Sequence, residues 1–321
     1  MATMHAAVVT SFDEPPHYLE TEVPVPHGEH EVLADVLAVG LHPRVRSGAS
    51  GAHYTSSGTL PMIPGVDGVA RLRNGETVYF VADDDTSGSL AERVVIDVRR
   101  SIRLPEGTDV ARVAASMNPA MSSWVALRRR VQLAPGASVL VLGATGSAGT
   151  AAVQVAKRLG AGHVIGAGRD EQRLDALTGL GADQVVRLTG DAAATTRDLA
   201  AAAEVDVVLD YLWGPPAAQA IVAILTARED RSRGLDWIEI GSVAGATAEV
   251  PSAALRSANL RLLGSGQGSV SPREYLAELP SLVEELQSGT IGVAPRTAPL
   301  SDVENMWAAP DVPGERIVFV P

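Results

Sequence analysis

The chain has 321 residues, a formal net charge of −12 and no cysteine, which excludes disulfides, thiolate metal sites and cysteine catalysis and makes nucleic acid an unexpected partner. No apolar run reaches the ~20 residues of a membrane-spanning helix, and the amino-terminal segment lacks the basic and apolar stretches of a secretory signal. We therefore expect a soluble, cytoplasmic protein with no membrane or nucleic-acid partner.

Residues up to about Pro105 form short β-like segments between turns. Proline and glycine interrupt them often, a pattern typical of a compact β-barrel-like domain. The expected strands cover residues 5–9, 31–39, 68–72, 76–82 and 89–97.

From Pro119 the pattern changes to alternating helices and strands. The continuous apolar run at 139–142 indicates a parallel strand buried on both faces. Together with the strands that follow, it predicts a doubly wound parallel sheet of the Rossmann type. A helix is then expected over 272–287, and a last strand over 316–321, without an obvious parallel partner, is expected to return to the first domain. The further strands of the parallel sheet cover 163–168, 183–187, 205–210, 237–241 and 260–264.

The turn after residue 142 has the glycine spacing of a dinucleotide site. Gly143 permits a sharp exit from the strand, Gly146 removes a side chain where a pyrophosphate approaches, and Gly149 lets the next helix pack closely. The amides and dipole at the start of that helix favour phosphate. A tight turn that binds nothing can have the same spacing, but the preceding strand and following amphipathic helix favour dinucleotide binding.

The end of the second strand favours NADP(H) over NAD. An NAD site usually carries an acidic residue there for the ribose 2′-hydroxyl, whereas here Gly168 precedes Arg169, and Arg173 lies one helical turn later. A guanidinium group can form charge-assisted contacts with a 2′-phosphate that a carboxylate would repel. In the alternative interpretation Arg169 is solvated, and Asp170 caps the helix or binds the ribose.

Over nearly its whole length the chain resembles the medium-chain dehydrogenase/reductase superfamily, and within it the zinc-independent quinone oxidoreductase branch. Five segments match in the order of the family. The resemblance implies a GroES-like β-barrel catalytic domain at 1–118 and 267–321 and a Rossmann dinucleotide-binding domain at 119–266. The matching segments are an active-site loop at 40–48, a proline-glycine segment at 60–69, a joining helix at 118–127 and nucleotide-facing turns at 143–149 and 263–268.

The zinc alcohol dehydrogenases of this superfamily carry a Cys in the first loop and a His in the proline-glycine segment. The corresponding places here are Leu41 or His42, and Val66, and the four-Cys structural zinc lobe is missing. Because a lone His42 cannot build a three-ligand zinc site, no metal is expected. The hydride acceptor must then already be electrophilic or be polarised by hydrogen bonds, which favours quinones and α,β-unsaturated carbonyls.

The expected reaction is direct hydride transfer from NADPH to such an acceptor, with the protein supplying orientation and a dry site. The developing enolate or phenolate oxygen needs a proton or a donor, and His42 and Tyr54 are the candidates. In the alternative interpretations His42 only hydrogen-bonds backbone or the nicotinamide ribose, and Tyr54 is a packed aromatic. The resemblance implies that Ser122 faces the nicotinamide, with a bond to its own helix backbone as the alternative.

Two other functions would use the same nucleotide-binding turns. One is an enoyl-thioester double-bond reductase, which would need a basic surface such as Arg44, Arg46 and 128–130 for a coenzyme A phosphate; the other is a non-catalytic NADPH-binding redox sensor. The family often forms dimers, so a homodimer is expected. The residues expected to bind the cofactor are Ser122, Gly143, Thr145, Gly146, Ser147, Ala148, Gly149, Gly168, Arg169, Arg173, Gly241, Ser242, Gly264, Ser265 and Gly266.

Overall fold

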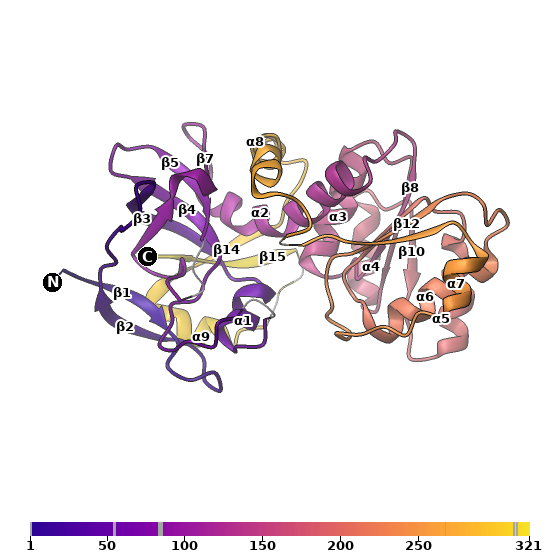
Figure 1. Cartoon of the computed structure of the whole chain (residues 1–321), viewed down its shortest axis with the longest axis horizontal. Coiled ribbons are helices and arrows are strands. Elements are labelled where there is room, and N and C mark those ends of the chain that lie inside the picture. The colour runs from indigo at the N-terminus through magenta and orange to yellow at the C-terminus, as the bar shows by residue number, and fades with distance from the viewer. Residues whose placement is uncertain (1, 54–55, 83–85, 267, 311, 313) are drawn as a thin grey trace. The chain divides into compact units, whose positions relative to one another are not determined.

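Two compact units make up the chain in the computed structural model (Figure 1). The first comprises Met1–Asn118 and Leu276–Pro321, and the second comprises Pro119–Tyr275. The boundaries fall inside helices α2 (Val110–Val125) and α8 (Pro272–Ser288), whereas the sequence-based division places the second one before α8. The structure describes residues 2–53, 56–82, 86–266, 268–310, 312 and 314–321.

The first unit is built on a mixed seven-stranded sheet and a separate antiparallel pair, β1 with β2. The sheet has the order β14-β15-β3-β4-β5-β7, and β6 pairs with β3. All five strands expected in this part of the sequence are present, and β2, β7 and β14 are additional. The bounds are β1 (Thr3–Val8), β2 (His17–Glu22), β3 (Glu31–Gly40), β4 (Asp67–Leu72), β5 (Thr77–Val81), β6 (Arg93–Asp97), β7 (Ser101–Arg103), β14 (Ala294–Pro299) and β15 (Glu315–Val320).

The carboxyl-terminal strand β15 is an inner strand of this sheet, with a neighbour on each side. It runs antiparallel to β3 and parallel to β14. The sequence of β14 is Ala-Pro-Arg-Thr-Ala-Pro, and proline and alanine are poor strand formers. This explains why no parallel partner of β15 was obvious in the sequence.

The first unit has an apolar core and few helices. Val39, Phe80, Leu90, Ile96 and Phe319 are almost fully buried within it. The segment at 40–48, expected as a loop, is largely a short helix that begins with proline, a favoured first helical residue. Besides α2 and α8, the helices are α1 (Pro43–Ala49) and α9 (Val303–Trp307), with helical turns at Val98–Arg100 and Leu300–Asp302.

The second unit is the expected doubly wound parallel sheet. Its order is β10-β9-β8-β11-β12-β13, which is the 3-2-1-4-5-6 order of dinucleotide-binding folds. All six strands predicted from the sequence are present within a few residues of the expected bounds. These are β8 (Ser138–Leu142), β9 (His163–Gly168), β10 (Gln184–Arg187), β11 (Val207–Asp210), β12 (Leu235–Glu239) and β13 (Leu260–Gly264).

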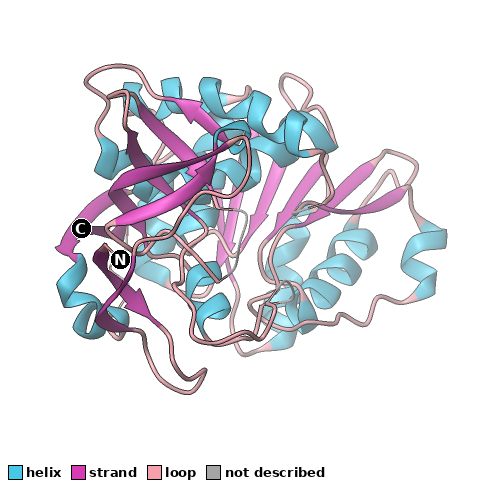
Figure 2. Cartoon of the chain, turned by 60° about the vertical axis from the view of Figure 1, so that its left-hand side comes forward, coloured by secondary structure: helices cyan, strands magenta, loops and turns pink. Residues whose placement is uncertain are grey.

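Helices cover both faces of this parallel sheet (Figure 2). Because the crossovers are right-handed, the two helices between β8 and β10 lie on one face and the three helices between β10 and β13 lie on the other. Leu140, Ile165, Val208, Ile224 and Trp237 are buried between the layers, as their apolar sequences predict. The helices are α3 (Ser147–Arg158), α4 (Glu171–Thr178), α5 (Ala192–Leu199), α6 (Gly214–Ala227) and α7 (Ser252–Ser257), with helical turns at Ala126–Arg130 and Ala200–Ala202.

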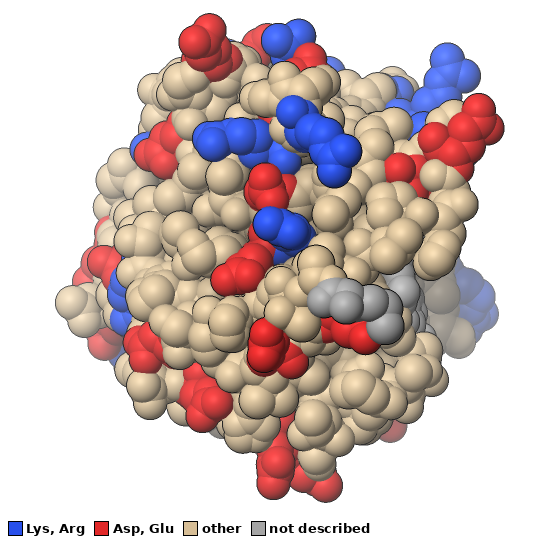
Figure 3. All heavy atoms as spheres, turned by 90° about the vertical axis from the view of Figure 1, so that its left-hand side faces the viewer, with Lys and Arg blue, Asp and Glu red and all other residues tan. Residues whose placement is uncertain are grey.

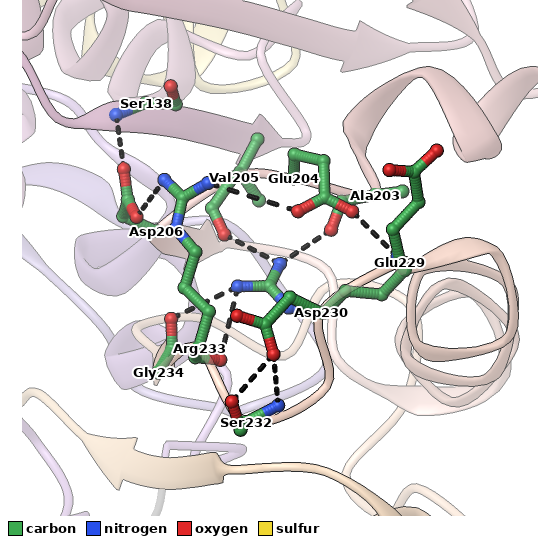
Figure 4. Close-up of polar contacts among 11 residues, drawn as sticks. Ser138, Ala203, Glu204, Val205, Asp206, Glu229, Asp230, Ser232, Arg233 and Gly234 are labelled. Atoms are coloured by element: carbon green, nitrogen blue, oxygen red, sulfur yellow. Dashed lines mark hydrogen bonds and ion pairs between the residues drawn. The ribbon is translucent and has the colours of Figure 1, made fainter.

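A polar cluster, called here the Arg228 cluster, lies at the amino-terminal ends of the parallel strands, and Figure 4 labels Asp206, Arg233 and Gly234 among its members. Asp206, just before β11, accepts a hydrogen bond from the Ser138 amide at 2.9 Å and pairs with Arg233. The guanidinium group of Arg228 is buried. It donates to the carbonyl oxygens of Ala203, Val205, Arg233 and Gly234 at 2.5–3.3 Å. The amino-terminal ends of these strands are therefore held by contacts within the protein.

Within the described residues, no helix is long and apolar enough to cross a membrane. On the face in Figure 3, carboxylates are scattered over much of the surface and basic side chains gather mainly near the top. The described residues of this face thus form no continuous basic surface of the kind that binds a nucleic-acid backbone.

Candidate functional site

The turn between β8 and α3 needs glycine at two of its three glycine positions. Gly143 has a φ of +84°, and a Cβ on Gly149 would lie 2.2 Å from the Gly143 carbonyl oxygen. Only glycine allows helix α3 to approach the strand this closely. A Cβ on Gly146 would lie 3.5 Å from the same oxygen, an ordinary contact. The fold therefore does not itself explain glycine at 146.

The start of α3 presents backbone donors. Gly146 is the N-cap and supplies no side chain, and its carbonyl accepts from the Thr150 amide at 2.8 Å. In the described part of the chain, the amides of Ser147, Ala148 and Gly149 have no hydrogen-bond acceptor. These donors and the positive end of the helix dipole make the turn suitable for phosphate.

The end of β9 packs directly against this turn. A Cβ on Gly168 would lie 2.5 Å from Cγ2 of Thr145. Nη1 of Arg173 donates to the Thr145 carbonyl oxygen at 3.3 Å, and its Nε lies 3.4 Å from a carboxylate oxygen of Asp170. Arg173 thereby ties the start of α4 to the glycine-rich turn.

Arg169 is exposed and makes no hydrogen bond or ion pair with the residues that the structure describes. Asp170 is the N-cap of α4 and accepts from the Arg173 amide at 3.0 Å, so the capping part of the alternative interpretation is present. Since capping and the ion pair with Arg173 occupy Asp170, Arg169 is left available to a ligand anion.

Ser122 is linked to the residue that follows β11. Its Oγ donates to the Pro119 carbonyl oxygen at 3.0 Å, the helix-backbone bond considered as the alternative, and it lies 3.0 Å from Oη of Tyr211. Burial raises the pKa of Tyr211 to about 12, so this side chain is a neutral phenol. Because the hydroxyl hydrogen of Ser122 goes to Pro119, the Tyr211 hydroxyl donates to Ser122.

Asp210, the last residue of β11, shapes the loop that follows and was missed from the sequence. Its carboxylate accepts from the amides of Leu212 and Trp213 at 2.8 and 3.0 Å and from Nε1 of Trp237 at 2.9 Å. Burial raises the pKa of Asp210, and these bonds oppose the rise. The bonds stabilise a loop in which Trp213 has a φ of +50°.

Two later segments expected to contact the cofactor, at 241–242 and 264–266, are fixed by backbone contacts. Gly241 donates from its amide to the Asp210 carbonyl oxygen at 3.2 Å, and Ser242 beside it is exposed. Arg130 donates to the carbonyl oxygens of Gly264 and Ser269 at 2.9 and 3.0 Å. Arg130 is therefore an anchor of the segment at 264–266.

The remaining members of this turn are Ser265 and Gly266. The Ser265 amide donates to the Glu239 carbonyl oxygen at 2.8 Å, and the Gly266 amide donates to Oγ of Ser269 at 2.9 Å. Burial, followed by the nearby Asp210 carboxylate, raises the pKa of Glu239. The turn after β13 is thus connected to the carboxyl end of β12.

In the first unit, His42 forms a buried network with Asp67 and Tyr79. Its Nε2 lies 3.0 Å from Oδ1 of Asp67, and the Tyr79 hydroxyl donates to Oδ2 at 2.6 Å. Nδ1 of His42 is buried without a partner among the described residues. Burial lowers the pKa of His42, against the raising effect of Asp67. A neutral imidazole that donates from Nε2 leaves Nδ1 as an acceptor.

Two expectations concern Tyr54 and the absence of a metal. Tyr54 lies outside the described residues. Among the described residues, no three His, Asp or Glu side chains are gathered as a group that could hold a metal ion. That the reaction needs no metal stays a prediction.

Comparison with known proteins defines the family. Residues 148–284 match the zinc-binding dehydrogenase family; the match lies outside the first-loop positions where zinc ligands would stand. The chain is 33% identical, over 364 aligned residues, to the probable NADPH-dependent quinone reductase tdiC of Emericella nidulans, covering 99% of this chain and 100% of that protein.

Two solved structures share the fold over the whole length. A probable oxidoreductase from Mycobacterium abscessus is 26% identical, with a TM-score of 0.79 and coverage of 100% of this chain and 99% of that one. The quinone oxidoreductase from Thermus thermophilus, whose complex with NADPH is also known, is 25% identical, with a TM-score of 0.78 and coverage of 99% and 100%. The chain therefore belongs to the medium-chain dehydrogenase/reductase superfamily, and within it to the zinc-independent quinone oxidoreductase branch.

Proposed function

We propose that this protein is an NADPH-dependent reductase that transfers hydride to a quinone or an α,β-unsaturated carbonyl without a metal. The observation that carries the proposal is the exposed Arg169 beside a glycine-rich turn whose helix amides are unpaired within the described chain. Relatives named as NADPH-dependent quinone reductases support both the cofactor and the acceptor class.

The residues of the second unit fit a bound NADPH, which would supply the hydride. Amides of Ser147 and Ala148 would hold the pyrophosphate, and Arg169 and Arg173 the 2′-phosphate. The later turns, at 241–242 and 264–266, would contact the rest of the cofactor. Ser122, with its hydroxyl held by Tyr211, would present a fixed oxygen toward the nicotinamide.

The acceptor would react because of its own electrophilicity. The described residues offer no cluster of metal ligands to polarise a carbonyl. His42 is neutral, with Nδ1 as a hydrogen-bond acceptor. It would accept a hydrogen bond from a hydroxyl group of a bound ligand and so orient that group, rather than donate a proton. Positioning and exclusion of water would then supply most of the rate acceleration.

The enoyl-thioester alternative finds less support in the described residues. The basic surface it needs would draw on Arg44, Arg46 and the run at 128–130. Arg46 donates to the Trp307 carbonyl and stacks over its ring, and Arg130 holds the turn at Gly264. Arg46 and Arg130 are thus already used to hold the fold.

NADPH oxidation against quinones, enones, enoyl thioesters and aldehydes tests the proposal. We expect quinones or enones to bleach bound NADPH in a single turnover. We also expect NADPH to bind much more tightly than NADH, and Arg169→Glu to weaken NADPH binding by about 2–4 kcal/mol. Intact NADPH with every acceptor would favour a redox sensor, and equal affinity for the two cofactors would refute the assignment.

We further propose a homodimer located in the cytoplasm. β13 is the last strand in the order of the parallel sheet, and an edge strand can pair with a second copy. Leu255 in the preceding helix and Val243 are exposed apolar residues. Sedimentation velocity tests the assembly, and a monomer at micromolar concentration would contradict it.

A further inference from the structure

A third arginine lies at the carboxyl-terminal ends of the strands, where the 2′-phosphate is expected. Arg187 is the last residue of β10 and is in register with Gly168, the last residue of β9. Its Nη1 lies 3.1 Å from Oε2 of Glu171, the first residue of α4. The two strand ends thus bring Arg187 to the same helix start that carries Arg169 and Arg173.

The charges around this helix start do not cancel. Three arginines, Arg169, Arg173 and Arg187, lie at this helix start, and among the described residues only two carboxylates, of Asp170 and Glu171, pair with them. In a protein with a formal net charge of −12, this local excess of positive charge stands out. It suits a ligand that carries negative charge of its own.

The two carboxylates have different roles. Asp170 caps α4 and pairs with Arg173, which is also bonded to the glycine-rich turn. Glu171 and Arg187 form an exposed pair, with 68% and 54% of their side chains accessible. An exposed pair of this kind contributes little stability, so a stronger anion can replace the Glu171 carboxylate at Arg187.

We propose that Arg187 is a ligand of the NADPH 2′-phosphate and that Glu171 is the counter-ion which holds Arg187 at the site until the phosphate displaces it. The inference rests on the proposed function, because it needs NADPH to bind at these strand ends. A phosphate group carries more charge and more acceptor oxygens than a carboxylate, so it is the better partner for a guanidinium. Glu171 then opposes NADPH binding, and Arg187 favours it.

Dissociation constants for NADPH and NADH, measured by fluorescence titration, test this assignment. Arg187→Gln should weaken NADPH binding about 10-fold, the loss of one charge-assisted contact, and leave NADH binding unchanged. Glu171→Gln should tighten NADPH binding about 3-fold, because it removes both the competitor and a repulsive charge. In the double variant most of that gain should disappear, since there is no Arg187 left to release.

Matched controls keep the result specific. Arg197→Gln removes an exposed arginine from α5, away from the strand ends, and should change neither affinity. Arg187→Lys should retain part of the NADPH preference. Adenosine 2′,5′-bisphosphate should lose affinity in Arg187→Gln, whereas adenosine 5′-monophosphate should not. Circular dichroism confirms that each variant is folded.

The outcomes separate this inference from the proposed function. If the wild type binds NADPH and NADH equally, the cofactor assignment fails and the role of Arg187 fails with it. If the wild type prefers NADPH but Arg187→Gln keeps that preference, the cofactor assignment stands and the role of Arg187 is wrong. If Glu171→Gln weakens NADPH binding, Glu171 supports the site and does not act as a displaced counter-ion.

Discussion

Gly146→Ala and Gly149→Ala should separate cofactor binding from folding, although both change the same turn. On Gly149, a Cβ would lie 2.2 Å from the Gly143 carbonyl oxygen and 2.7 Å from the Ala144 Cα. Both are backbone atoms, so β8 or α3 would have to shift. On Gly146, a Cβ meets only an ordinary contact, and its φ of −83° and ψ of 161° are open to any residue.

We expect Gly149→Ala to lower the free energy of unfolding by about 2 kcal/mol. Overpacking costs about 1–3 kcal/mol, and contacts of this length place the cost at the upper end, while the helix propensity of alanine returns about 1 kcal/mol. Gly146→Ala should cost only about 0.5 kcal/mol, because alanine is a poorer N-cap than glycine. Its methyl group lies where the pyrophosphate must approach, so NADPH affinity should fall about 10-fold or more.

Urea denaturation and NADPH fluorescence titration measure the two effects on the same preparations. Gly146→Val provides a graded control, because its larger side chain should weaken NADPH binding further than alanine does. Unchanged NADPH affinity in Gly146→Ala would mean that no phosphate approaches this residue. A wild-type unfolding midpoint in Gly149→Ala would mean that the close approach of α3 to β8 is not required.

Other predictions concern the two polar networks and the metal. Arg228→Leu should lower the free energy of unfolding by about 3 kcal/mol, because buried carbonyls lose their donor, and leave NADPH affinity unchanged. Burial lowers the pKa of His42 in the folded protein below its ordinary value of 6.5. At a pH between the folded and the ordinary pKa, only the unfolded chain binds the proton, so the free energy of unfolding should fall as the pH drops from 7.5 to 5.5. The fall should be larger in the wild type than in His42→Gln. Equal pH slopes would contradict this. Prolonged chelation should leave turnover unchanged, and loss of stoichiometric zinc together with activity would refute it.

The parallel sheet was predictable because its signals are local. A central strand such as β8 is an apolar run of a few residues, and a strand buried on both faces is recognisable from that run alone. Gly143 and Gly149 were also predictable, since a positive φ and a close helix approach are needs of the turn itself. The structure bears out both requirements.

The polar networks were not predictable because their partners are distant in sequence. Asp67 lies 25 residues from His42, and Arg130 lies 134 residues from Gly264. No spacing rule connects such pairs, and only the tertiary fold brings them together. Asp210 could have been found, because a carboxylate at the end of an apolar strand must find donors, and the amides two and three residues later are within its reach.

The amino-terminal and carboxyl-terminal ends of the parallel strands differ in how completely the polar groups around them are paired. At the amino-terminal ends, Arg228 and Asp206 bond to backbone groups of their own unit. At the carboxyl-terminal ends, the first amides of α3 have no acceptor in the described chain, and Arg169 has no anion. Unpaired donors are tolerated where a ligand completes them. Because of this asymmetry we expect the phosphates of a dinucleotide to bind at the carboxyl-terminal ends of the strands. We also expect substitutions in the Arg228 cluster to lower stability without changing binding.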